Sequence, residues 1–154
     1  MDPTLTMLQR LLAAGSKRLV VRGVQLSDDP SIARLAERHK GHGDDAGIDW
    51  TALRGFADWA RRQPEQVAAA VEDPPARTGT PLDAILASMT EELCDRNGLA
   101  RPRWTSDVPR LPRRWEPPGT PRMRERARKT TPATFRARNL TVAAEDIFRS
   151  TARS

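Results

Sequence analysis

The chain has 154 residues, of which 30% are charged and 38% hydrophobic, and it carries 13 prolines. This length suits one domain or two very small ones, and the composition predicts a modest core with extended, solvated connections. The single cysteine, Cys94, excludes an internal disulfide and is consistent with a reducing cytoplasm. We find no signal-peptide pattern and no apolar run of about 20 residues, so we expect a cytoplasmic protein without a membrane partner.

The net charge of +6 is distributed unevenly along the chain. From Arg101 to the end there are 14 basic and 5 acidic residues, a balance of +9, whereas the remainder has a balance of −3. The basic charge therefore belongs to the C-terminal third, which is expected to attract a polyanion or an acidic protein surface.

A capping side chain followed by proline recurs along the chain. Asp or Thr accepts hydrogen bonds from the free amides of a first helical turn, and proline next to it has no amide to leave unpaired. Such pairs predict helix starts at Asp2-Pro3, Asp29-Pro30, Thr80-Pro81, Thr120-Pro121 and Thr131-Pro132. Further starts are predicted at Asp49, Pro64 and Thr141, and helix ends at Gly15, Gly41 and Gly98.

Residues 1–72 form a predicted N-terminal helical region. Apolar residues three or four positions apart mark one face of each helix. They are Leu5, Leu8 and Leu12 in the first helix, Ile32 and Leu35 in the second, and Trp50, Leu53, Phe56, Ala57 and Ala60 in the third. The valine-rich segment from Arg18 to Leu26 is predicted to be one strand or an extended connection, and residues 40–46 a linker.

A linker at residues 72–80 leads to the second predicted region, residues 80–154. The clearest helix of the chain is predicted here, from Leu82 to Asn97. Its apolar stripe consists of Leu82, Ile85, Leu86, Met89 and Leu93. Cys94 is expected in the core, whereas the opposite face, with Thr90, Glu91, Asp95 and Arg96, is expected to be solvated.

The segment 101–120 contains prolines that exclude a regular helix, and it predicts an extended strap. Asn139 is expected to turn the chain further on. The aromatic residues expected to pin the strap and a short helix to the bundle, as structural anchors, are Trp104, Trp115 and Phe135. The predicted fold class is therefore mainly α, a small helical bundle with a proline-rich extended strap and basic C-terminal helices.

Residues that could run a reaction are few. His39 and His42 lie near Asp44 and Asp45, but glycines interrupt the helix that would aim metal ligands, so a solvated loop is the preferred interpretation. Nothing near Cys94 indicates an activated thiol. We therefore predict no enzyme, no cofactor, no metal and no small-molecule substrate; a small enzyme acting through the histidines stays as a third hypothesis.

The informative segment is the helix predicted from Pro121. It is rich in arginine and contains only two apolar side chains, Met123 and Ala127. Self-repulsion makes such a helix marginal without an anionic partner, and helices of this kind bind phosphates or acidic protein grooves; the alternative is a merely solvated charged helix. The candidate contacts of this segment and the residues after it are Arg122, Arg124, Arg126, Arg128, Lys129, Arg136 and Arg138.

The C-terminal half also resembles a known family. The order is a helix ending in Arg-Asn-Gly-Leu-Ala-Arg-Pro-Arg-Trp104, a tryptophan at 115, and then Thr-Pro-Ala-Thr-Phe-Arg-Ala-Arg-Asn-Leu-Thr-Val-Ala-Ala-Glu-Asp-Ile147. Over residues 80 to 148 this resembles actinobacterial antitoxin-like proteins encoded beside nucleotidyltransferase-type toxins. The chain departs from that pattern at Thr134, Ala137 and Glu116, and residues 1–70 show no convincing helix-turn-helix.

The resemblance implies a non-enzymatic protein that binds and neutralises a partner, a toxin or another acidic-surfaced protein, and it is compatible with repression of its own promoter. The second hypothesis is a nucleic-acid-binding regulator that contacts DNA or RNA through the basic C-terminal segment, as the sequence pI of about 10.8 indicates. The two roles are compatible, since a partner-binding protein can also bind DNA.

Overall fold

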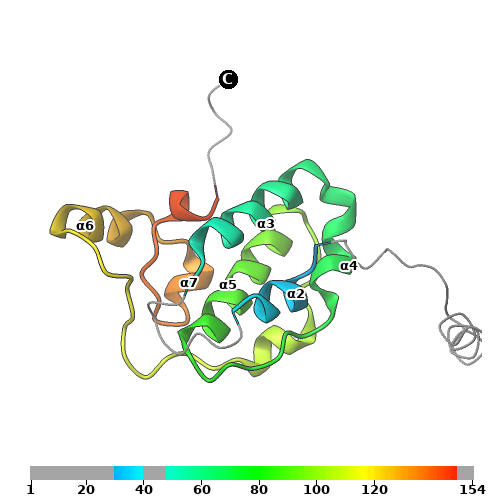
Figure 1. Ribbon diagram of the computed structural model, residues 1–154, viewed down its shortest axis with the longest axis horizontal. Coiled ribbons are helices and arrows are strands. Elements are labelled where there is room, and N and C mark those ends of the chain that lie inside the picture. The colour runs from blue at the N-terminus through cyan, green and yellow to red at the C-terminus, as the bar shows by residue number, and fades with distance from the viewer. Residues whose placement is uncertain (1–29, 40–47, 149–154) are drawn as a thin grey trace, which may run out of the picture. The chain divides into compact units, whose positions relative to one another are not determined.

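The computed structural model describes residues 30–39 and 48–148. The chain divides at the junction of Pro30 and Ser31, and everything below concerns the second unit, Ser31–Ser154. Its described part is a small, mainly helical bundle, as predicted, with a single isolated parallel bridge between Trp115 and Leu140 in place of a sheet (Figure 1). Predictions for residues 1–29 and 40–47, which include the first helix and His42, lie outside the described residues.

The first two described helices begin at side-chain caps. Helix α2 (Ile32–Glu37) begins later than predicted, because Ser31 rather than Asp29 is its N-cap and the Ser31 hydroxyl accepts the Arg34 amide at 3.1 Å. Helix α3 (Trp50–Arg62) begins at the predicted cap, Asp49, whose carboxylate accepts the amide of Ala52 at 3.0 Å.

His39 lies between these helices, and the predicted solvated loop is wrong for this residue. Its side chain is buried, with Nδ1 3.0 Å from the carbonyl oxygen of Leu35 and Nε2 accepting the backbone amide of Asp49 at 3.0 Å. The two bonds together assign the ring proton to Nδ1. A neutral imidazole with both nitrogens bonded is buried at little cost, so His39 joins the end of α2 to the start of α3.

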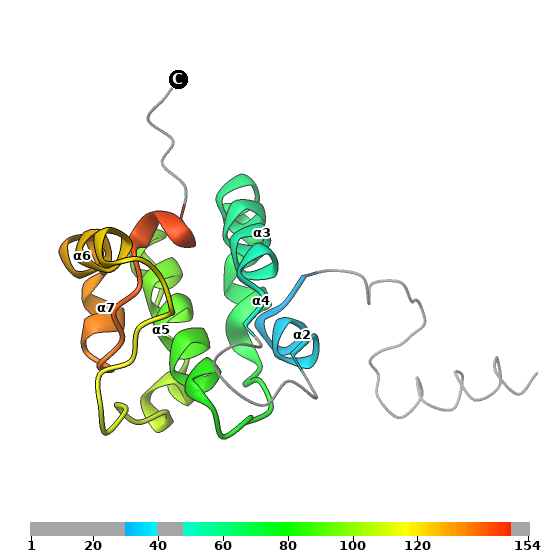
Figure 2. The ribbon, with the colours of Figure 1, turned by 60° about the vertical axis from the view of Figure 1, so that its left-hand side comes forward.

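Helix α5 (Pro81–Arg96) is the central helix of the bundle. The Thr80 hydroxyl caps it by accepting the Leu82 amide at 3.2 Å, and Gly98, with φ 67°, follows its end as predicted. The turn η3 (Pro64–Gln66) begins at the predicted start and leads into α4 (Val67–Glu72), which packs against α5 together with α2 (Figures 1 and 2).

The far side of α5 is covered by elements from the end of the chain, which pack on it closely. Thr90 and Glu91 are therefore buried, and the predicted solvated face is wrong at these two positions. Neighbours can approach here because Ala84, Ala87 and Ser88 carry small side chains that are themselves buried. Cys94 is buried in the core, as predicted.

The strap after α5 contains the 3-10 turn η4 (Arg103–Asp107) and is otherwise extended. The indole Nε1 of Trp104 donates to the carbonyl of Val71 at 2.9 Å, which ties the strap to the end of α4. The ring of Trp115 stacks on that of Trp50, with centroids 6.4 Å apart. Both tryptophans thus hold the strap on helices that precede it in the sequence.

The chain returns to α5 through the short helix α7 (Ala133–Arg136), whose Phe135 is fully buried. Asn139, with φ 69°, turns the chain after this helix, as predicted. Thr131 is not the N-cap of α7, contrary to the prediction. It ends the preceding helix instead, where its hydroxyl donates to the carbonyl of Ala127 at 2.6 Å.

The last described element is also shorter than predicted. It is the single 3-10 turn η5 (Ala144–Asp146), which follows Ala143, so Thr141 caps no helix. The backbone amide of Thr141 instead donates to the carbonyl of Trp115 at 2.9 Å, because this segment runs beside the strap.

One hydrophobic core joins helices α2, α3, α4, α5 and α7 and the segment that follows α7. The predicted N-terminal region contributes Leu53 and Val67 to it, and the predicted C-terminal region contributes Ile85, Phe135 and Leu140. Residues 72–80 therefore connect two parts of the same core, and the division of the chain lies at residue 30 instead.

Candidate interaction surface on helix α6

Helix α6 (Pro121–Thr130) begins where the capping pattern predicts it. Thr120 is extended, its hydroxyl accepts the amide of Met123 at 3.1 Å, and Pro121 occupies the first turn. The ten residues carry five cations and one carboxylate, a net charge of +4. Ala127 is the helix's single buried residue, so tertiary packing stabilises α6 very little.

Helix α6 lies at one edge of the bundle, against η5 (Figures 1 and 2). Ala127 points inward, and Arg122, Glu125 and Lys129 lie on the opposite side of the helix, with Arg126 at the border of that side. All four are exposed, and together they form the outward face. Arg122, Arg126 and Lys129 are four and three residues apart, so helical geometry places them in one row.

Three of the five cations are paired with carboxylates of the same chain. Arg126 Nε lies 2.9 Å from Glu145 of η5, and Arg128 lies 3.7 Å from Glu116 of the strap. Lys129 pairs along the helix with Glu125 at 3.5 Å. The cationic side chains are 52%, 48% and 72% exposed respectively, so each pair contributes at most about 1 kcal/mol and exchanges readily.

The other two cations of α6 form no ion pair within the described residues. Arg122 is exposed on the outward face, whereas Arg124 is half-buried on the side that faces the strap. The helix therefore presents cationic charge that its own fold does not neutralise, although less of it than the bare sequence indicates.

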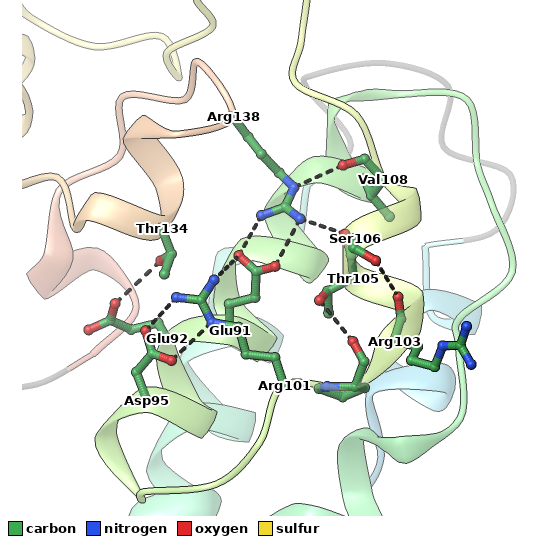
Figure 3. A network of polar contacts seen from close by, with 11 residues as sticks. Glu91, Glu92, Asp95, Arg101, Arg103, Thr105, Ser106, Val108, Thr134 and Arg138 are labelled. Carbon is green, nitrogen blue, oxygen red and sulfur yellow. Dashed lines mark hydrogen bonds and ion pairs between the residues drawn. The ribbon is translucent and has the colours of Figure 1, made fainter.

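Arg138 has a different role from the one predicted for it, because it is buried. Its guanidinium donates to both carboxylate oxygens of Glu91, at 2.7 and 3.0 Å, and to the carbonyls of Thr105 and Val108 at 2.6 and 3.2 Å (Figure 3). The side chains of Arg138 and Glu91 are 9% and 7% exposed. Arg138 is thus a structural residue that joins α5, the strap and the end of α7, and it cannot reach a partner.

Glu91 is the residue of this network that the sequence did not reveal. Burial alone would raise the pKa of its carboxyl, but hydrogen bonds from Arg138 and Thr105, with the charges of Arg138 and Arg101, outweigh it and lower the pKa. Arg101 also donates two hydrogen bonds to Asp95, and these lower the pKa of that carboxyl (Figure 3). The available signal was that small residues surround Glu91 on its helix face.

Arg136 is exposed, and its guanidinium donates to the carbonyl of Thr131 at the end of α6. It lies on α7 rather than on the outward face of α6. Of the seven predicted contacts, the structure therefore brings together Arg122, Arg126 and Lys129 on one face, with Arg124 and Arg128 beside it.

Two other reactive side chains in the described residues, Cys94 and His39, are buried and have structural roles. Burial raises the pKa of the Cys94 thiol, which keeps the sulfur protonated, and His39 uses both ring nitrogens for backbone bonds. No group of three or more His, Cys, Asp or Glu side chains in the described ranges has metal-binding geometry. Likewise, none of the described helices is long and apolar enough to cross a membrane.

No family model, curated protein or solved structure matches the chain.

Proposed function

We propose that this chain is a non-enzymatic, cytoplasmic protein that binds and neutralises a partner protein, in the manner of an antitoxin, through the outward face of α6. The observation that carries the proposal is the state of this helix: a net charge of +4 with one buried alanine. A helix that buries so little and repels itself gains most from a partner of opposite charge. The resemblance of residues 80–148 to antitoxin-like proteins supports the same role.

The rest of the bundle supports a scaffold rather than a catalyst. Three of its buried polar groups, Glu91, Arg138 and His39, bond to one another or to the backbone. Rigid scaffolds of this kind hold a binding element in a fixed orientation.

Co-expression with the product of the neighbouring gene tests the proposal. We expect the two proteins to co-purify and the growth defect caused by the neighbour to be suppressed. The triple variant Arg122→Ala, Arg126→Ala, Lys129→Ala should lose both properties, because it removes the outward cations. The matched control, Arg62→Ala, Arg103→Ala, Arg110→Ala, removes three exposed arginines elsewhere and should retain both. Equal behaviour of the two triple variants would contradict the proposal.

The second candidate function is nucleic-acid binding, which the alignment of Arg122, Arg126 and Lys129 along one exposed row favours. Three cations in a row can neutralise about three phosphates, so log K against log salt should have a slope near −2.7 on duplex DNA. The outward triple variant should abolish that slope. Duplex binding that is absent at low salt would eliminate this candidate.

A further inference from the structure

Beside the outward face of α6, on the Ala127 side of the helix, lies an apolar side chain that borders the cations. Met123 is 48% exposed and is the large hydrophobic residue that stands out as exposed in the described part of the chain. Arg122 precedes it directly and Arg126 follows it by one turn. A half-exposed methionine contributes little to its own core, so its position between two cations needs another reason.

Met123 rests on the strap rather than on the bundle. A Cβ built at Gly119 would lie 3.4 Å from Met123 Cε, an ordinary van der Waals distance, so the methionine lies close to the backbone of Gly119. Beside it is a small pocket of about 30 Å³. Its lining residues are Glu116, Pro117, Pro118, Gly119, Met123, Arg124, Arg126, Ala127 and Asp146.

The lining of this pocket is partly apolar and partly charged. Two prolines, a glycine, Met123 and Ala127 supply the apolar part, and the volume suits the end of one aliphatic side chain. The charged part carries both signs. Burial raises the pKa of Asp146, and the charge of Arg126 offsets only part of that rise.

The charge pattern of the surrounding surface discriminates between two kinds of partner. Glu125 lies on the outward face among the cations, and Glu116 and Glu145 hold Arg128 and Arg126. A row of phosphates meets repulsion from each of these carboxylates. A protein segment can place its own carboxylates opposite the cations alone and an apolar group opposite Met123.

We propose that the partner of α6 is a protein segment with an apolar side chain flanked by acidic residues. The apolar side chain packs on Met123 at the pocket over Gly119, and the flanking carboxylates bind Arg122 and Arg126. Glu145 is the internal carboxylate that the partner displaces from Arg126, and the displacement costs little because that pair is half-exposed. This inference rests on the proposed function, for which it names the chemical class of the partner.

Selection from a randomised peptide library on the full-length chain, at about 0.15 M salt, tests the inference without a known partner. We expect the enriched peptides to carry a Leu, Ile, Met or aromatic residue with Asp or Glu on both sides. Met123→Ser should weaken their binding about 5- to 20-fold, as measured by fluorescence anisotropy, because the apolar contact is lost. Met123→Leu, which keeps that contact, should retain the affinity.

A second variant tests whether a carboxylate of the partner replaces Glu145 at Arg126. Glu145→Gln frees Arg126 and removes one negative charge beside it, so it should strengthen binding of the selected peptides about two- to fivefold. Thermal unfolding monitored by circular dichroism verifies that each variant keeps its fold, which is expected because both side chains are exposed.

Three outcomes would overturn the inference: enriched peptides without an apolar position, equal binding to the Met123→Ser variant, or weaker binding to the Glu145→Gln variant. Failure to enrich any peptide, together with tight binding of a 20-base-pair duplex, would assign the surface to nucleic acid. If the neighbouring gene product co-purifies but Met123→Ser has no effect on it, the proposed function stands and this inference fails.

Discussion

Two arginines of the basic C-terminal segment form ion pairs in opposite surroundings. Arg138 lies inside the bundle, where four hydrogen bonds from its guanidinium reach a carboxylate and two carbonyls. Arg126 lies on α6, paired with the Glu145 carboxylate on the surface. In the sequence both are members of one basic segment, yet only the second can exchange its partner. Burial therefore decides which arginines are structural and which are available for binding.

The physical reason is the dielectric environment. A buried carboxylate that loses its cation keeps its charge without compensation, whereas an exposed one regains water at once.

The largest effect is expected when Arg138 is removed. Arg138→Met removes the two hydrogen bonds to the buried Glu91 carboxylate and leaves it only the longer ion pair with Arg101, at 3.5 Å. It also deprives the carbonyls of Thr105 and Val108 of donors. We expect a loss of about 3–5 kcal/mol in the free energy of unfolding, measured by urea denaturation. The double variant Arg138→Met, Glu91→Leu should recover part of it, because no buried charge then remains. A loss below about 1 kcal/mol in the single variant would show that this pair is not buried.

The second prediction concerns pH. The pKa of Glu91 is lowered in the folded chain, so its contribution to stability is present above the pKa of an unfolded glutamate, about 4.3, and is lost as the pH falls through the folded pKa. The pKa of Asp95 is also lowered in the folded chain, so its contribution to stability is likewise lost as the pH falls. The free energy of unfolding should therefore decline below pH about 4, and more steeply in the wild type than in Glu91→Gln. Parallel pH profiles of the two proteins would contradict this assignment.

The comparison also explains what the sequence could predict. A helix cap depends on only two or three neighbouring residues, so the sequence predicts the caps at Asp49, Thr80 and Thr120. The turn at Asn139 is predicted in the same way. The fold class and the outward row of α6 follow from helical spacing alone.

Local sequence patterns do not predict hydrogen-bond partners that are far apart in the sequence. The partner of Arg138 is 47 residues away, and Nε2 of His39 accepts a hydrogen bond from an amide ten residues further along the chain. A capping motif is also only permissive: Thr131 precedes a proline as Thr120 does, but its hydroxyl bonds backward to Ala127. The distinction between Arg126 and Arg138 depends on which elements cover α5, and no local pattern specifies this.

The third prediction compares two helix caps of the same chemistry. Thr120→Ala removes the acceptor for the Met123 amide and should cost about 1 kcal/mol, confined to α6 because this helix packs little. Thr80→Ala removes the corresponding cap of α5, which is buried in the core, and should lower the stability of the whole bundle. Hydrogen exchange distinguishes the two: the first variant should accelerate exchange in α6 alone, the second throughout the described helices. Global acceleration by Thr120→Ala would mean that α6 is part of the cooperative core.

The smallest effect is expected at the exposed pairs of α6. Arg126→Ala and Arg128→Ala each break one surface ion pair, with Glu145 and Glu116 respectively, and each should change the free energy of unfolding by at most about 1 kcal/mol. The effect should shrink further at 1 M salt, where screening extends over about 3 Å. Urea denaturation at low and high salt measures both changes. Because Arg138 is buried, the loss caused by Arg138→Met should persist at high salt, and this contrast separates the exposed arginines from the structural one without any partner present.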